Sequence, residues 1–230
     1  MDSNNKINFD EVQKSFYEKT WTEEILDYKS RPGVPNWISY IPNTFFVKFL
    51  DQLEISPCSK FLDVGCGAGR HTVYAAEKGF LAYGIDFCKA ALKKAKIHAK
   101  NKGVGKRTGF LCSQAYELPF EDNFFDLIND SGCFNHINPK HWNAYSKEIF
   151  RVLKKGGIYR LKAVSHNSRD VWGYIPGIKD RWILQTNNQY KYYFKKEELE
   201  KIFSNLEIVK LRDRFISKKN KFFFMVAKKK

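Results

Sequence analysis

The chain has 230 residues, of which 43% are hydrophobic and 16% aromatic, so it can bury a sizeable core and is not an intrinsically disordered protein. Its formal net charge of +15 favours an anionic partner such as nucleic acid or a membrane surface, or serves solubility alone. The five cysteines form no CxxC pair and no apolar run approaches ~18 residues, which argues against a disulfide framework, a zinc ribbon and a membrane span.

The first part of the chain is predicted to be helical. Residues 9–28 carry apolar side chains near helical spacing, and residues 43–54 place a second apolar stripe along one helix face. The proline- and glycine-containing segment 31–35 breaks the chain between them. The amino terminus has no hydrophobic signal core, so a reduced, soluble, cytoplasmic protein is expected.

From residue 60 onward, short apolar runs alternate with helical patterns. Strands are expected at residues 61–64, 81–85, 109–112, 124–129 and 158–164, and helices at residues 70–78, 89–102 and 139–154. Gly103 ends the second of these helices, and Gly156 with Gly157 ends the third. Strands that alternate with helices predict βαβ units, and therefore a parallel sheet with right-handed crossovers.

After residue 165 the chain becomes irregular before it regains regular structure. A helix is expected at residues 195–203, and two strands at 206–211 and 222–227 close the chain. Positive charge concentrates in this last part, and the chain contains no internal repeat.

The segment 61–70, FLDVGCGAGR, reads as a strand, a glycine-rich turn and the start of a helix. Glycines let the backbone turn tightly and approach a ligand closely, and the helix start offers free N–H groups to an anion. Asp86 ends the next strand, 21 residues after Gly65, where a carboxylate suits the hydroxyl pair of a ribose. This spacing predicts a nucleoside-containing ligand.

Three kinds of nucleoside ligand compete for this turn. A P-loop needs Gly-Lys-Ser/Thr, which does not follow here. A dinucleotide site needs GxGxxG, and Arg70 occupies its sixth position, which weakens an NAD(P) or FAD interpretation. The remaining pattern, DVGCGAG at residues 63–69, closely resembles motif I of class I S-adenosylmethionine-dependent methyltransferases.

The resemblance extends over nearly the whole chain. Glu117–Phe120 with Phe125–Ile128 is similar to the third-loop and fourth-strand signature of that family, and Leu153–Gly157 is similar to its turn into strand five. The resemblance implies an α/β Rossmann-like sheet of seven mostly parallel strands, with helices on both faces. The implied strand order is 3-2-1-4-5-7-6, with strand seven antiparallel.

The resemblance also implies S-adenosylmethionine as cofactor, with S-adenosylhomocysteine as product, and a single domain over residues 1–230. Residues 1–56 would form a helical cap or lid, residues 57–165 the cofactor-binding core, and residues 166–230 an acceptor-side insertion with closing strands. The residues expected to contact the cofactor are Asp63, Gly65, Cys66, Gly67, Gly69, Asp86, Phe87, Gln114, Ala115, Asp130 and Ser131. Among them, Asp86 would accept both ribose hydroxyls and Phe87 would lie against adenine. At Gln114 many relatives have an acidic residue.

The sequence says less about the methyl acceptor than about the cofactor. The Asp/Asn-Pro-Pro-Tyr/Phe motif of enzymes that methylate base or amide nitrogens is absent. The segment 130–136 instead resembles small-molecule methyltransferases of the thiol, thiopurine and tellurite types. Within it, His136 is the candidate general base and Asp130 a second catalytic candidate, whereas Cys133 is interpreted as a core residue. Candidate substrate-binding residues are Tyr17, Trp21, Trp37, Asn135, Trp172 and Tyr174.

Two other functions remain open from the sequence. An RNA or protein methyltransferase could hold a polyanion on the basic C-terminal face. A cofactor-binding scaffold without catalysis is disfavoured, because motif I is intact. We therefore expect a monomeric or homodimeric enzyme that acts on a small molecule, without a metal, a membrane or a favoured nucleic-acid partner.

Overall fold

The structure, a computed structural model, describes residues 9–22, 38–54, 56, 58–168, 182–184, 189–217 and 220–230. Its α-helices are α1 (Phe9–Thr22), α2 (Thr44–Leu50), α3 (Arg70–Glu77), α4 (Lys89–Asn101), α5 (Trp142–Val152) and α6 (Lys196–Ile202). Its strands are β1 (Lys60–Val64), β2 (Leu81–Asp86), β3 (Thr108–Cys112), β4 (Phe125–Ser131), β5 (Leu153–Val164), β6 (Trp182–Leu184), β7 (Tyr190–Tyr192), β8 (Glu207–Phe215) and β9 (Lys221–Lys228). Short 3₁₀ turns stand at Gly105–Arg107, Phe134–His136 and Pro139–His141.

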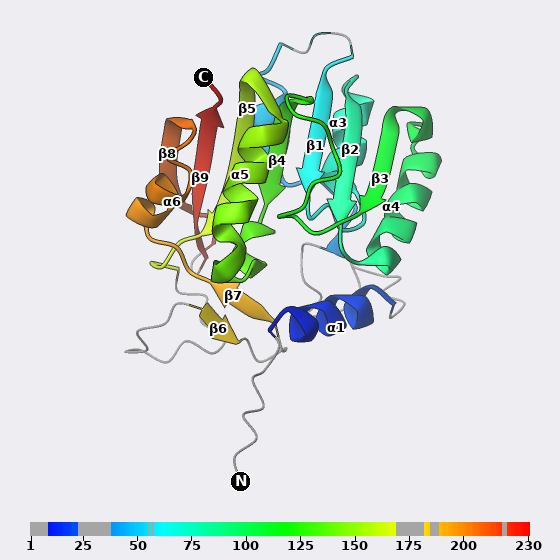
Figure 1. The fold of residues 1–230 in the computed structure, drawn as a ribbon. Helices are drawn as coiled ribbons and strands as arrows, with labels where there is room; N and C mark the ends of the chain where they lie inside the picture. Colours follow the sequence, from blue (N-terminus) through cyan, green and yellow to red (C-terminus); the bar gives the residue numbers. More distant parts are fainter. Residues whose placement is uncertain are drawn as a thin grey trace.

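Seven strands form one sheet in the order β3-β2-β1-β4-β5-β9-β8 (Figure 1). The first five are parallel, and β9 is antiparallel to both β5 and β8. This confirms the predicted fold, in which β8 and β9 are the sixth and seventh strands of the expected sheet. The carboxyl ends of β1, β2 and β4 consequently lie at one edge, where an open parallel sheet binds its ligands.

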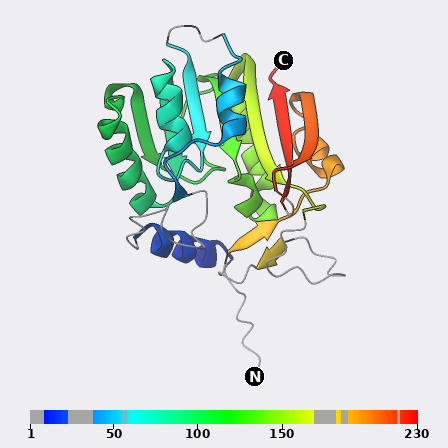
Figure 2. The same ribbon diagram turned by 180° about the vertical axis from the view of Figure 1, so that it is seen from behind.

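Helices cover the two faces of the sheet because its central strands are apolar on both sides, as parallel strands are. Four of the five residues of β1 are buried. On one face α2 and α3 pack against β1, β2 and β4 through Phe46, Leu50 and Ala75, and Figure 2 shows these helices in front of the sheet. On the other face the main core packs α5 and α6 against the sheet, with Tyr145 and Phe203 fully buried.

The boundary between the helix expected at 139–154 and the next strand was predicted wrongly. The helix ends at Val152, and Leu153 already has an extended backbone and pairs with Phe125 of β4. Leu153 is fully buried. Strand pairing and burial therefore fix this boundary ahead of the two glycines, which lie inside β5.

Two further elements differ from the prediction. The helix expected at 43–54 ends at Leu50, because the amides of Gln52 and Leu53 bond to carbonyls three residues back and tighten the chain into a turn. The antiparallel pair of β6 and β7 was not predicted. The helix expected at 9–28 reaches Thr22, and its remainder lies outside the described residues. Among the described helices, none is both long and apolar enough to cross a bilayer.

Candidate functional site

The glycine-rich turn joins β1 to α3 at the carboxyl edge of the sheet. Gly65, Gly67 and Gly69 have φ angles of +67°, +54° and +77°. Residues other than glycine rarely adopt this backbone region. A Cβ atom added at Gly65 would stand 2.6 Å from the Cβ atom of Cys133 in the turn after β4. The turn therefore needs glycine both for its backbone conformation and for its approach to the neighbouring turn.

Asp86 lies at the end of β2, beside the glycine turn. Its Oδ2 accepts the Gly67 N–H at 2.9 Å, and its Oδ1 accepts the Cys88 N–H at 2.9 Å. A carboxylate offers about four acceptor positions, so each oxygen of Asp86 keeps one for a ligand. This arrangement fits the vicinal hydroxyls of a ribose. Burial raises the pKa of Asp86 to about 6, against the lowering effect of the backbone N–H groups of Cys88, Gly67 and Phe87.

Asp130, predicted as a cofactor contact and a catalytic candidate, has a carboxylate whose hydrogen bonds are made inside the chain. Oδ1 accepts the N–H groups of Gly132 and Cys133, and Oδ2 accepts the Phe134 N–H and the Tyr145 hydroxyl. The four donors occupy the four acceptor positions, and the residue is completely buried. Asp130 thus holds the turn after β4 in place, and donors of the chain itself take all four acceptor positions of its carboxylate.

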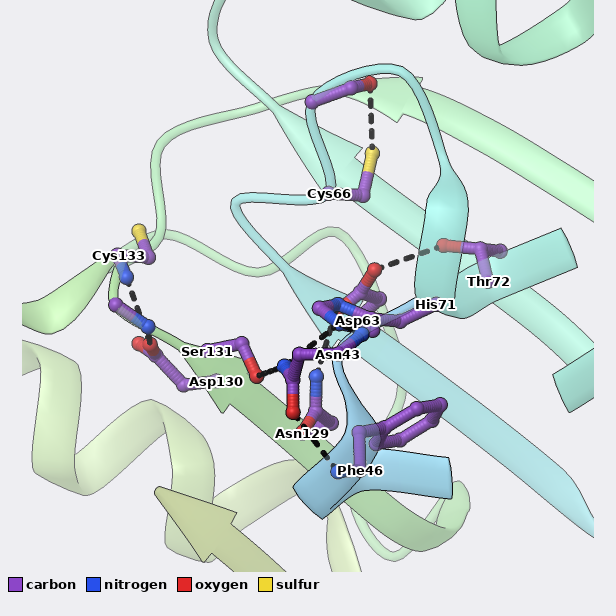
Figure 3. A network of polar contacts seen from close by, with 12 residues as sticks. Asn43, Phe46, Asp63, Cys66, His71, Thr72, Asn129, Asp130, Ser131 and Cys133 are labelled. Carbon is purple, nitrogen blue, oxygen red and sulfur yellow. Dashed lines mark hydrogen bonds and ion pairs between the residues drawn. The ribbon is translucent and has the colours of Figure 1, made fainter. Parts of the chain in front are cut away.

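Asp63 and Ser131, both expected at the cofactor, belong to a polar cluster beneath the turn (Figure 3). Asp63 is 1% exposed and accepts hydrogen bonds from Asn129 Nδ2 at 2.8 Å and from the Thr72 hydroxyl at 3.1 Å. Burial raises the pKa of Asp63 to about 7. The Ser131 hydroxyl accepts from Asn43 Nδ2 at 3.3 Å. These contacts tie β1, β4, α3 and the start of α2 together.

The same cluster contains residues that the sequence analysis missed. His71 is 3% exposed, and burial lowers its pKa well below the usual value, which keeps it neutral. Its Nε2 lies 2.9 Å from Asn43 Nδ2. Arg160 of β5 donates from Nη1 to Asn129 Oδ1 at 2.7 Å. The signal was present in the sequence: Arg160 and Lys162 alternate with apolar residues along a strand that is otherwise hydrophobic.

The other predicted cofactor contacts lie around the same edge. The Phe87 ring meets Tyr17 of α1 edge to face, with centroids 5.6 Å apart. The turn that carries Gln114 and Ala115 begins where the Ser113 N–H bonds to the Asp86 carbonyl at 3.2 Å. Cys66 is 6% exposed, and burial raises the pKa of its thiol well above the usual value.

Helix α1 lies over the glycine turn, where a lid was expected. Trp21 is 3% exposed and packs against Ala68, Cys88 and Ala91. A Cβ atom at Gly67 would stand 3.0 Å from the Trp21 ring. Two candidate substrate residues, Tyr17 and Trp21, therefore lie at the site. The other aromatic candidates, Trp37, Trp172 and Tyr174, lie outside the described residues.

Asn135 and His136 follow β4 and are held by neighbouring strands. Asn135 is 2% exposed, and its Oδ1 accepts the N–H of Val164 at 2.9 Å. His136 Nδ1 lies 2.6 Å from the Tyr190 carbonyl oxygen, which can only accept, so Nδ1 carries the proton and Nε2 the lone pair. Burial lowers the pKa of His136 to about 3, so the ring is neutral and a weak base.

An open hollow of about 580 Å³ lies elsewhere, between α6 and β8. Its lining includes His166, Arg212 and Asp213, and none of the predicted site residues.

The chain resembles known methyltransferases in both sequence and fold. Residues 61–157 match the family described as a methyltransferase domain. An uncharacterized methyltransferase of Synechocystis is 36% identical over 112 residues, which cover 49% of this chain and 50% of the relative. Norajmaline N-methyltransferase of Rauvolfia serpentina is 30% identical over 124 residues, which cover 54% of this chain and 41% of the relative. The chain thus spans half or less of these curated relatives.

Solved structures share the fold over most of the chain. The 1,6-didemethyltoxoflavin-N1-methyltransferase of Burkholderia thailandensis, with bound S-adenosylhomocysteine, has a TM-score of 0.70 at 18% identity, covering 96% of this chain and 88% of its own. An S-adenosylmethionine-dependent methyltransferase of Methanosarcina mazei has a TM-score of 0.66 at 23% identity, covering 82% of this chain and 98% of its own. Residues 61–157 therefore match the methyltransferase domain family, and the chain shares the fold of solved S-adenosylmethionine-dependent methyltransferases.

Proposed function

We propose that this chain is an S-adenosylmethionine-dependent methyltransferase that acts on a small-molecule acceptor. The observation that carries the proposal is the pairing of the glycine turn with Asp86, whose two oxygens each keep one acceptor position at the ligand-binding edge. When bound, S-adenosylmethionine supplies a sulfonium-activated methyl group that an acceptor atom takes by in-line displacement.

The residues of the chain would mainly bind, orient and exclude water. Gly65, Cys66 and Gly67 would line the methionine and ribose portions of the cofactor, with Gly69 completing the turn. Asp86 would accept both ribose hydroxyls. Phe87, Gln114 and Ala115 would surround the adenine. This arrangement is supported by the turns after β1, β2 and β3, which lie together at one edge of the sheet.

Residues 1–56 would act as a cap, residues 57–165 as the cofactor-binding core, and residues 166–230 as the acceptor-side part with the closing strands. The burial of Trp21 against the first turn of the core supports the cap. A cap that excludes water strengthens the electrostatic interactions inside the site and keeps the sulfonium from hydrolysis.

The acceptor would enter beside the turn after β4, near Asn135 and His136. Because its pKa is near 3, His136 is better suited to orient an acceptor through Nε2 than to remove a proton at neutral pH. A thiolate acceptor, as in the thiol-type enzymes that the sequence resembles, needs no base. Trp37, Trp172 and Tyr174 remain candidate pocket residues on sequence grounds alone.

Relatives with small-molecule substrates in their names favour a small acceptor over the RNA or protein alternative, which rests on the net charge of +15. The test is calorimetric binding of S-adenosylhomocysteine. Asp86→Ala should weaken binding at least tenfold, because charge-assisted hydrogen bonds are each worth about 1.5–3 kcal/mol. The exposed Asp122→Ala control should bind as the wild type does. No binding by the wild type, or equal binding by Asp86→Ala, contradicts the proposal.

A further inference from the structure

Arg160 presents a buried nitrogen without a partner at the floor of the candidate site. The residue is 4% exposed, and its guanidinium lies 5.6 Å from the ring centroids of both Phe46 and Phe49. Nη1 donates to Asn129 Oδ1 at 2.7 Å and to the Ser131 hydroxyl at 3.2 Å. Nη2 is buried and has no hydrogen-bond partner. Buried polar groups are nearly always satisfied, so this nitrogen is an indication that a ligand group is missing.

Lys162 stands two residues further along β5, on the same face of the sheet and nearer to its carboxyl end. It pairs in register with Ser131, the last residue of β4. Its ammonium lies 4.1 Å from the ring centroid of Phe222. Within the described parts of the chain, no carboxylate lies within ion-pair distance of it.

Cations gather around this position. Burial lowers the pKa of Lys162 to about 7, and the positive charges of Arg70, Arg160 and Lys191 lower it further. Mutually repelling cations in a buried position are costly unless an anion joins them. Arg160 is partly compensated, because Asn129 connects it to Asp63, whereas Lys162 has no such connection.

We propose that Arg160 and Lys162 form a subsite for a carboxylate or phosphate group of the acceptor molecule. Arg160 Nη2 would donate to an anion oxygen, and the Lys162 ammonium would contact the same group from the crevice side. Ser131 places this subsite at the end of β4, next to the glycine turn that would hold the methyl donor. This inference rests on the proposed function and adds to it that the acceptor is an anion.

The carboxylate of the cofactor's methionine portion has the same chemistry, so the experiment must separate the two sources. Lys162→Gln is the main variant, because it removes the charge at the edge of the network. Arg160→Lys is the second, and the proposal stays testable on Lys162→Gln alone if Arg160→Lys does not fold. Lys155→Gln, an exposed lysine at the other end of β5, is the matched control.

Two measurements are made on the full chain. In the first, S-adenosylhomocysteine binding is measured by calorimetry for each variant. In the second, inorganic phosphate is titrated into the protein saturated with S-adenosylhomocysteine, at constant ionic strength set by chloride, and binding is followed by the melting temperature. We expect unchanged S-adenosylhomocysteine affinity in Lys162→Gln, and phosphate binding at least tenfold weaker than in the wild type and in Lys155→Gln.

Two outcomes overturn the inference. Phosphate that does not stabilise the wild type, or stabilises Lys162→Gln equally, shows that no such anion subsite exists. A tenfold loss of S-adenosylhomocysteine affinity in Lys162→Gln assigns these cations to the cofactor's carboxylate instead. Failure of the proposed function has a different signature, because the wild type would then not bind S-adenosylhomocysteine while its response to phosphate could persist.

Discussion

Asp86 and Asp130 show how the same residue type takes different roles at neighbouring strand ends. Desolvation raises the pKa of both carboxyls to about 6, although Asp130 is fully buried and Asp86 is only partly buried. Asp130 receives four donors from the chain, one of them the hydroxyl of Tyr145 on α5. Asp86 receives two, both from adjacent backbone. The number of donors already present, together with the partial exposure of Asp86, distinguishes the residue that can still bind a ligand.

Cofactor binding should therefore depend on pH through Asp86. Its folded pKa of about 6 means that the carboxylate, the form that accepts two hydroxyls, is complete above this value and lost as the pH falls through it. S-adenosylhomocysteine affinity should fall roughly tenfold between pH 7.5 and pH 5. Calorimetry of the wild type and of Asp86→Asn checks this. An Asp86→Asn variant with the same pH dependence would assign the effect to another group.

The side chain of Asn129 connects the buried charged groups of Asp63 and Arg160. Its amide nitrogen donates to Asp63 and its amide oxygen accepts from Arg160. Asn129→Ala leaves both charged groups without this partner, which should lower the free energy of unfolding by about 2–4 kcal/mol. Urea denaturation measures the change. Asn143→Ala, on the exposed side of α5, should stay within about 0.5 kcal/mol of the wild type, and equal stability of the two variants would contradict the bridging role.

At the scale of elements, α1 is attached to the core by apolar packing and by side-chain hydrogen bonds. Trp21 packs over the glycine turn, Gln13 Nε2 donates to the carbonyls of His136 and Tyr190, and Glu18 accepts the Lys89 N–H. The helix therefore extends from the glycine turn to β7 and the turn after β4 (Figure 1). Such an element can open locally while the sheet remains folded.

Trp21→Ala should detach α1 without unfolding the sheet. Limited trypsin digestion should cut after Lys14 and Lys19 several-fold faster in this variant, whereas the urea midpoint of the sheet should move little. Ile97→Ala, a half-exposed apolar residue on α4, serves as the control and should be cut as slowly as the wild type. If Trp21→Ala and Ile97→Ala are cut equally, α1 is not held by Trp21.

At the scale of the whole molecule, the net charge of +15 comes from lysines spread along the chain, and the sequence contains no known nucleic-acid-binding motif. Binding to RNA should consequently be weak, indifferent to sequence and steeply dependent on salt. Filter binding or fluorescence anisotropy between 50 and 200 mM salt, with two unrelated RNAs, tests this. Tight binding to one defined RNA at physiological salt would favour the RNA methyltransferase alternative.

Element boundaries show where local sequence stops determining structure. The glycines at 156 and 157 indicated the end of a helix, yet Leu153 is already paired with Phe125 of β4. The antiparallel pair of β6 and β7 had no clear local pattern. In both cases a partner that is distant in the sequence decides the backbone conformation, as is usual for strands.

The sequence by itself determined the alternation of strands and helices, the strand order that motif I implies, and the place of Asp86 beside the glycine turn. These features depend on backbone conformation and short spacing, which a chain carries locally. Only the tertiary structure decided that Asp130 is saturated, that Asn129 joins Asp63 to Arg160, and that Arg160 keeps an unpartnered nitrogen. The physical reason is that a buried polar group is defined by its donors and acceptors, and here they come from strands and helices far apart in the sequence.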